Sequence, residues 1–214
     1  MEAQPVTAQY PVRLSIDYPD RELNRATTFF RLIVAIPIFI VLVSISGGAS
    51  GGWGKDAGKA VWIGAGGFLF LAPLLLIVFR QKYPRWWFDW NLNLSRFSTR
   101  VAAYASLMDD RYPSTDEEQY VHLDIDYPNV ETDLNRWLPL VKWFLAIPHF
   151  IVLVFLGIAG FFAVVFAWFA ILFTGRYPRG LFDFVEGVFR WGARVEGYAI
   201  LLVTDRYPPF SLQP

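Results

Sequence analysis

The chain has 214 residues, of which 55% are hydrophobic and 18% are aromatic, and its formal net charge is zero. This charge balance gives no indication of a nucleic-acid partner, and the absence of cysteine excludes disulfides and thiolate metal sites. The composition is typical of a small membrane protein that crosses the bilayer several times.

Two short segments alternate between apolar and polar residues, which is the pattern of a half-buried β-strand. They are residues 12–16 and 121–125, and a Tyr-Pro pair follows shortly after each. Because an isolated strand is not stable, we expect these strands to pair with each other on the cytoplasmic side, or with other strands near the chain ends.

The first apolar segment predicts a membrane-spanning helix over roughly Phe29–Ser46, capped by Asn24 or Thr27. Pro37 lies inside this helix and should kink it. A second span is expected over roughly Val61–Phe79, after a Gly-rich connection.

Residues 85–108 predict a different kind of helix. One face carries apolar residues at helical spacing, among them Phe97 and Tyr104, and polar residues lie largely opposite. Residues 184–202 repeat this pattern, with Trp191 on the apolar face. We expect both segments to lie in the membrane interface as amphipathic helices.

The longest apolar stretch runs from Leu138 to Phe173, and Lys142 and His149 are its only strongly polar side chains. The stretch is much longer than the roughly 20 residues that one crossing takes. Small residues at 157–160 would permit a tight turn, so we predict a helical hairpin with a kink at Pro148.

The two apolar regions are similar to each other. Leu23-Asn24-Arg25 returns as Leu134-Asn135-Arg136, and Arg31 aligns with Lys142 near the start of a span, where both could reach the interface. Matching segments follow in the same order over nearly the whole length, which indicates an internal duplication. We therefore divide the chain into a first repeat, residues 1–113, and a second, residues 114–214.

The predicted fold is an all-α integral membrane protein with four transmembrane helices, arranged as two tandem helical hairpins. Two interfacial amphipathic helices and short cytoplasmic β-strands complete it. Lys and Arg are more frequent before the first span and after the second than between them, which places both termini in the cytoplasm. The copies should then be parallel repeats related by an axis along the membrane normal.

Candidate site residues are sparse. One flank of each amphipathic helix carries an aspartate and two arginines: Asp89, Arg96 and Arg100 in the first copy, and Asp183, Arg190 and Arg194 in the second. Arginine binds phosphate in a bidentate manner, so these residues could form two lipid-headgroup sites. An Asp–Arg ion network that fastens each helix to the rest of the protein is the alternative, and the one that we favour.

His149 is the only histidine in a predicted span, which makes it a candidate site for a proton or a ligand. We favour an ordinary helix–helix hydrogen bond, because the predicted spans hold no second histidine and no carboxylate. We expect no cofactor and no metal, since no phosphate-binding loop or cluster of metal ligands is visible.

The second copy contains the strings LPLVKWFLAIPHFIVLVFL, FTGRYPRGLFDF and LLVTDRYPPFSL. These strings resemble an uncharacterised bacterial membrane-protein family, the domain of unknown function 4389. The first copy is similar more loosely, with Trp86-Trp87 where the second copy has Gly180-Leu181. The resemblance implies a multi-pass protein of the bacterial cytoplasmic membrane with a repeat architecture, and it implies no activity.

We favour a non-enzymatic accessory or scaffolding subunit of a larger membrane complex, because the spans are rich in packing residues and poor in polar ones. The alternative is a small transporter, channel or lipid-binding protein with a site between the two repeats near His149. A membrane enzyme is the third possibility and the least favoured. The expected partners are membrane lipids and either a membrane-protein partner or further copies of this chain.

Overall fold

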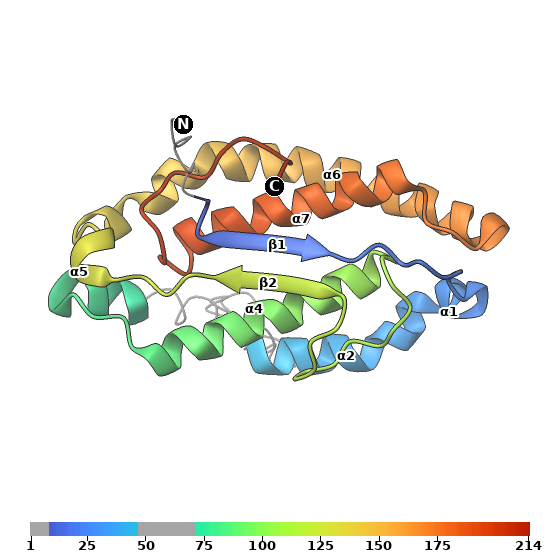
Figure 1. Ribbon diagram of the computed structural model, residues 1–214, viewed down its shortest axis with the longest axis horizontal. Helices are drawn as coiled ribbons and strands as arrows, with labels where there is room; N and C mark the ends of the chain where they lie inside the picture. Colours follow the sequence, from blue (N-terminus) through green and yellow to red (C-terminus); the bar gives the residue numbers. More distant parts are fainter. Residues whose placement is uncertain (1–8, 47–71) are drawn as a thin grey trace, which may run out of the picture.

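The computed structural model describes residues 9–46 and 72–214. A two-stranded antiparallel sheet lies on one side of the molecule (Figure 1). β1 (Val12–Ile16) pairs with β2 (Val121–Ile125), and Leu14 lies opposite Leu123 at the centre. The predicted strands and their mutual pairing are therefore confirmed.

The helices that the structure describes form two further layers around the sheet, and in Figure 1 they lie above and below the two strands. The middle layer consists of α4 (Arg85–Ala105) and α7 (Arg179–Ala199), and the outer layer of α2 (Arg31–Ser46) and α6 (Lys142–Thr174). α4 packs between β2 and α2, while α7 packs between β1 and α6.

Shorter elements connect these layers. They are α1 (Arg25–Phe29), a π-helical turn (Leu76–Arg80), α5 (Val130–Asp133) and a 3₁₀ turn (Leu138–Leu140). Asn24 caps α1, because its side-chain oxygen accepts hydrogen bonds from the backbone N–H groups of Ala26 and Thr27.

The strands and the middle helices share one core. The inward-facing side chains Leu14 and Leu123 are buried and belong to the same cluster as Ala103 of α4 and Phe182 of α7. Burying one face of each strand in this way sets the register, since a slip of one residue would turn the apolar face to solvent.

The sequence predicts that the two amphipathic helices turn their apolar faces to the membrane interface, and the structure differs. Their apolar faces are covered by the outer helices: Phe97 and Tyr104 of α4 pack on Ala35 and Ile38 of α2. In the second half, Trp191 and its neighbours pack on α6 in the same way. The opposite face of α4 is also covered, as the burial of its Ser95 shows. α4 is therefore covered on two opposite faces.

The stretch predicted as a transmembrane hairpin is one continuous helix. α6 runs unbroken through Gly157 and Gly160. Glycine inside a helix costs only about 1 kcal/mol relative to alanine. A turn at this place would instead leave main-chain polar groups without partners in apolar surroundings.

Among the described residues, α6 is the one helix that is long and apolar enough to cross a membrane, where the sequence predicted four spans. α2 covers most of the first predicted span and has 16 residues. The second predicted span, Val61–Phe79, lies mostly outside the described residues.

Gly197 lets α7 approach β1 closely, and its replacement gives a first testable prediction. A Cβ added here would lie 2.6 Å from Cγ2 of Val12, a buried side chain that is stiff at χ1. We expect Gly197→Ala to lower the free energy of unfolding by about 1–3 kcal/mol. At Gly192 in the same helix, nothing lies within 4 Å of an added Cβ. Gly192→Ala should therefore be neutral or stabilising by up to about 1 kcal/mol. Denaturation of both variants in the same detergent measures the difference, and equal effects would contradict the close approach.

Candidate functional site

The first arginine of each predicted Asp–Arg stripe ties its helix to the nearer strand. Nε of Arg96 donates to the carbonyl oxygen of Leu123 over 2.8 Å, and Nε of Arg190 donates to that of Leu14 over 2.9 Å. Arg96 also forms an ion pair with Asp124 at 3.1 Å. Corresponding residues of the two halves therefore make corresponding contacts.

The second arginine of each stripe holds the chain segment that follows its helix. Arg100 and Arg194 donate to main-chain carbonyl groups, which belong to Ser114, Thr115, Ser211 and Gln213. Both arginines are buried, and this burial lowers the pKa of each, with a smaller contribution from the neighbouring arginine of its stripe. Two donor nitrogens of each arginine are thus bound to the main chain, and the lipid-headgroup sites remain a prediction.

The aspartates of the stripes do not contact these arginines. Asp89 pairs with Arg85 at 3.3 Å, and Asp183 pairs with Arg179 at 3.1 Å, each with a residue four positions earlier on the same helix. Each stripe therefore consists of one surface ion pair and two arginines that bind separate main-chain carbonyl groups. It does not form one connected ion network.

The buried His149 contacts a cluster of aromatic side chains. The indole Nε1 of Trp191 donates to Nδ1 of His149 over 3.1 Å, which joins α7 to α6, and the ring of Phe210 stacks on the imidazole at 4.0 Å between centroids. The other ring nitrogen, Nε2, is buried without a hydrogen-bond partner in the described part of the chain. The predicted helix–helix hydrogen bond is thus present in the structure.

Pro37 and Pro148 occupy corresponding places in α2 and α6. Each lies six residues after the first residue of its helix, and each helix continues beyond it. The kinks predicted at these prolines remain predictions.

Lys142 is completely buried and does not reach the interface as the sequence suggested. Its ammonium group donates to the carbonyl oxygen of Thr204 over 2.9 Å and pairs with Asp205 at 2.7 Å. The ring of Tyr198 lies 5.3 Å from the charge. A buried cation is tolerable when it is paired and hydrogen-bonded in this way.

Arg31, which aligns with Lys142, is also buried but has no acidic partner in residues 9–46 and 72–214. Its guanidinium lies 4.0 Å from the centre of the Tyr104 ring, the counterpart of Tyr198. None of its three nitrogens has a hydrogen-bond partner among the described residues. The carboxylate that aligns with Asp205 is Asp110, and it is bound by Arg21 and by the backbone N–H of Asn24.

Arg21 accompanies this asymmetry between the two halves, because it occupies the carboxylate of Asp110. It also binds the neighbouring Asp109 at 2.6 Å, and Arg111 binds the same carboxylate at 3.0 Å. Burial alone would raise the pKa of Asp109, but the hydrogen bonds from Arg111 and the charges of both arginines outweigh it and lower the pKa. The position that corresponds to Arg21 in the second half is Thr132, so Asp205 stays free for Lys142.

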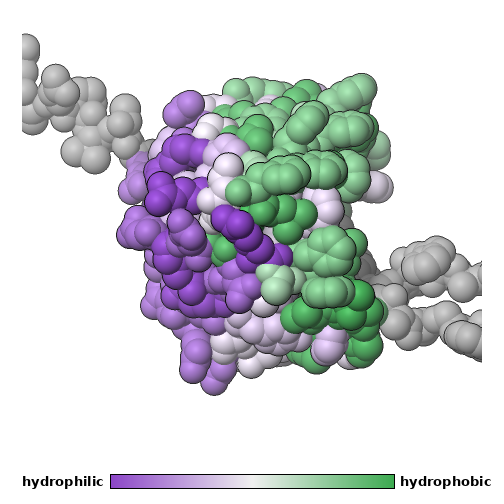
Figure 2. Space-filling model, turned by 90° about the vertical axis from the view of Figure 1, so that its right-hand side faces the viewer, coloured by the Kyte–Doolittle hydropathy of each residue, from purple (hydrophilic) through white to green (hydrophobic). Residues whose placement is uncertain are grey.

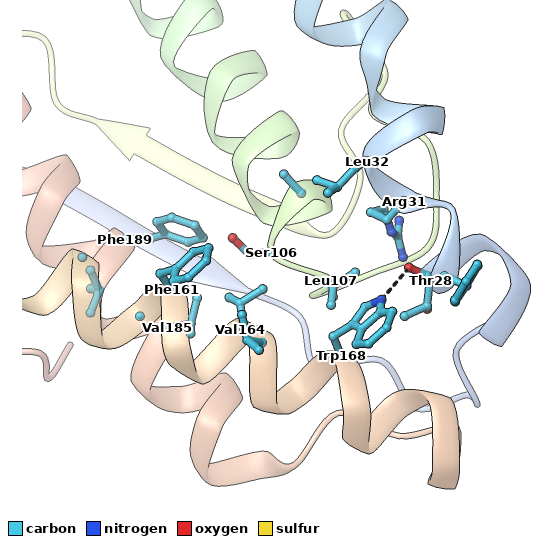
Figure 3. A pocket seen from close by; sticks show the side chains of 16 residues that line it. Thr28, Arg31, Leu32, Ser106, Leu107, Phe161, Val164, Trp168, Val185 and Phe189 are labelled. Carbon is cyan, nitrogen blue, oxygen red and sulfur yellow. Dashed lines mark hydrogen bonds between the residues drawn. The ribbon is translucent and has the colours of Figure 1, made fainter.

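Arg31 lines a cavity of about 630 Å³ between α2 and α6 (Figure 3). Ala105, Ser106 and Leu107 contribute from the end of α4, and α7 contributes an apolar wall. His149 is not among the lining residues. This cavity, which is lined by residues of both halves, is therefore not the site near His149 that the sequence offered as an alternative, and that site remains a prediction.

Comparison with known proteins identifies a family for part of the chain. Residues 137–211 match the family described as "Domain of unknown function (DUF4389)", and the match covers about a third of the 214 residues. The second half thus contains one domain of this family. No curated protein and no solved structure matches the chain.

The cavity and its arginine were not identified from the sequence, although one signal was present. The alignment of the copies pairs Arg31 with Lys142 and Asp110 with Asp205, and it sets Arg21 against Thr132. Arg21 is a cation that only the first copy has, and it can compete with Arg31 for Asp110. Its presence indicates that one of the two aligned cations has no carboxylate partner. Only the contacts in the structure show which cation this is.

Proposed function

We propose that the protein is a non-enzymatic accessory protein that lies with its α2–α6 side in a lipid bilayer and presents the sheet to water. The observation that carries this proposal is the separation of the two kinds of surface. Seen end-on, hydrophobic residues gather on one side of the molecule and hydrophilic residues on the other (Figure 2).

The apolar side is built from the outer helices. The exposed side chains of α6 include Phe155, Phe166 and Phe173, which are 68%, 64% and 78% accessible, and those of α2 include Leu32 at 77%. Soluble monomeric proteins rarely expose continuous apolar patches of this kind. We favour lipid over a protein partner, because protein interfaces carry regular hydrogen bonds and a polar rim, and the exposed face along α6 is apolar.

The opposite side carries ion pairs that suit an aqueous environment. Arg13 pairs with Asp126, and His122 pairs with Asp17, across the outer face of the sheet. The hydrogen bond to Asp17 raises the pKa of His122. We place this layer on the cytoplasmic side of a bacterial cytoplasmic membrane, the membrane that the family resemblance implies. A partner subunit that binds this side would contact polar and charged side chains.

The geometry favours an orientation of α6 along the membrane plane. α6 runs along the long axis of the molecule, as the strands do (Figure 1). If α6 stood upright, the charged sheet beside it would enter the hydrocarbon region, where charged side chains are costly. A helix whose apolar face enters the headgroup and acyl boundary avoids that cost.

Spin labels test this proposal, because the chain has no cysteine of its own. Single cysteines at Phe144, Phe155 and Phe166 lie eleven residues apart on the exposed face of α6, and Asp124 provides a position on the outer face of the sheet. In liposomes, we expect the three α6 labels to be accessible to oxygen, protected from a water-soluble nickel reagent, and at similar depth. The label at Asp124 should show the opposite accessibility.

Two outcomes would contradict the proposal. Access of the nickel reagent to all α6 labels would exclude insertion of this face. Depths that differ by about 16 Å between successive labels, the rise of eleven helical residues, would show that α6 crosses the membrane upright.

A further inference from the structure

We propose that the cavity between α2 and α6 binds one anionic lipid, with Arg31 and Thr28 holding its phosphate or carboxylate and the apolar walls holding an acyl chain. This inference rests on the proposed membrane insertion, because the cavity opens on the side assigned to lipid. Leu32 and Phe161 form its rim and are 77% and 64% exposed.

The head-group end is defined by two buried polar groups that lack partners. Arg31 is 2% exposed, and neither its nitrogens nor the hydroxyl oxygen of Thr28, which is fully buried, has a hydrogen-bond partner in residues 9–46 or 72–214. Leaving a charged group buried and unpaired is among the most costly arrangements in a protein interior. An anion bound here would supply the missing charge and acceptors.

Arginine suits a phosphate or carboxylate in particular. Its planar guanidinium presents parallel N–H donors that match two oxygens of one anionic group. The ring of Tyr104 lies 4.0 Å from the guanidinium and supports one face of it. Figure 3 shows Arg31 and Thr28 beside Trp168 at one end of the cavity. The indole Nε1 of Trp168 donates to the carbonyl oxygen of Thr28 over 3.2 Å, so this wall is held in place.

The other end of the cavity suits an apolar chain. Figure 3 shows Phe161 and Phe189 facing each other there, with Val164 and Val185 nearby. A volume of about 630 Å³ is within the usual range for small-molecule sites. A free inorganic anion would leave this apolar space unused, whereas an amphiphile fills both ends.

The second half has no equivalent site. There the corresponding cation, Lys142, already has Asp205 and a main-chain carbonyl as partners. We therefore expect one anionic lipid per chain.

Native mass spectrometry of the full chain in mild detergent tests this inference. The probes are phosphatidylglycerol, phosphatidylcholine with the same acyl chains, palmitate and inorganic phosphate. We expect one phosphatidylglycerol or palmitate per chain, bound more tightly than phosphatidylcholine and than inorganic phosphate. Arg31→Gln should weaken binding of the anionic lipid by at least about tenfold, as expected for loss of a charge-assisted hydrogen bond. Arg25→Gln is the matched control, since Arg25 is exposed in the adjacent helix.

Thermal unfolding separates a binding role of Arg31 from a structural one. Arg31→Met removes the unpaired charge and keeps an apolar side chain on Tyr104, so it should raise the Tm of the lipid-free protein and abolish the increase that phosphatidylglycerol causes. A lower Tm of the lipid-free variant would show that Arg31 is structural and would overturn the proposal. Binding of phosphatidylglycerol to Arg31→Gln as tightly as to the native chain would also overturn it, as would binding of inorganic phosphate as tight as that of the lipid.

The proposed site and the proposed membrane insertion can fail separately. Arg31→Gln with a spin label at Phe155 should insert into liposomes like the native sequence. If Arg31→Gln inserts normally and still binds the anionic lipid as tightly as the native chain, the proposed lipid site is wrong and the proposed insertion is unaffected. If the nickel reagent reaches the Phe155 label in the otherwise native chain, the proposed insertion is wrong. The binding of lipid measured in detergent does not depend on that result.

Discussion

Asp205→Asn is expected to lower the free energy of unfolding by about 3–5 kcal/mol, because it leaves Lys142 charged and without its counterion in the interior. The Lys142 side chain is 0% exposed, and its ammonium group lies 2.7 Å from the carboxylate. The hydrogen bond to the carbonyl of Thr204 remains in the variant, but a carbonyl dipole does not replace a full charge. Denaturation of the purified protein in detergent measures the effect.

Asp110→Asn is the matched control, because Asp110 aligns with Asp205 in the first half. Its partner Arg21 is 51% exposed and can be solvated when the carboxylate is removed. The expected loss is therefore about 1 kcal/mol or less, in the range of exposed ion pairs. If both variants lower the free energy of unfolding equally, the burial of Lys142 does not determine the cost of losing its counterion. The inferred energetic difference between the two halves is then wrong.

The distance between the two ends of α6 is expected to be about 45 Å, measured between spin labels at Trp143 and Phe173. These residues are 30 positions apart in one helix, each adds about 1.5 Å, and both side chains are exposed. A hairpin with a turn near Gly157 would bring its two ends to roughly the 8–10 Å that separates packed helices. Distances measured by pulsed electron paramagnetic resonance therefore distinguish a continuous helix from a hairpin.

A shorter label pair serves as the control for this measurement. Trp143 and Phe155 should be about 18 Å apart in either arrangement, because both lie before the predicted turn. A correct short distance combined with a short end-to-end distance would show that α6 is broken and that the sequence-based hairpin is right.

The sequence by itself determined the elements whose pattern is local. The alternation over residues 12–16 and 121–125 predicted both strands with their observed bounds. The helical spacing of apolar residues predicted α4 and α7, together with the burial of Phe97 and Trp191. In each case, the side that must be covered can be recognised from the order of residues alone.

The tertiary structure decided what covers those apolar faces. A sequence pattern shows that the face with Phe97 needs apolar surroundings, and lipid and another helix satisfy this need equally well. The continuity of α6 was undecided for a similar reason, since glycine is compatible with both a turn and a helix interior. The choice depends on contacts with residues far away in the chain.

The candidate site depended on the tertiary structure most strongly. At its polar end, Arg31 has no acidic partner among the described residues, while Arg21 binds Asp109 and Asp110, residues almost ninety positions later. The alignment of the two copies identified Arg31 and Lys142 as corresponding cations, and no sequence pattern distinguishes the paired one from the unpaired one. The energy of a charge depends on which groups lie within a few ångströms of it, and only folding brings those groups together.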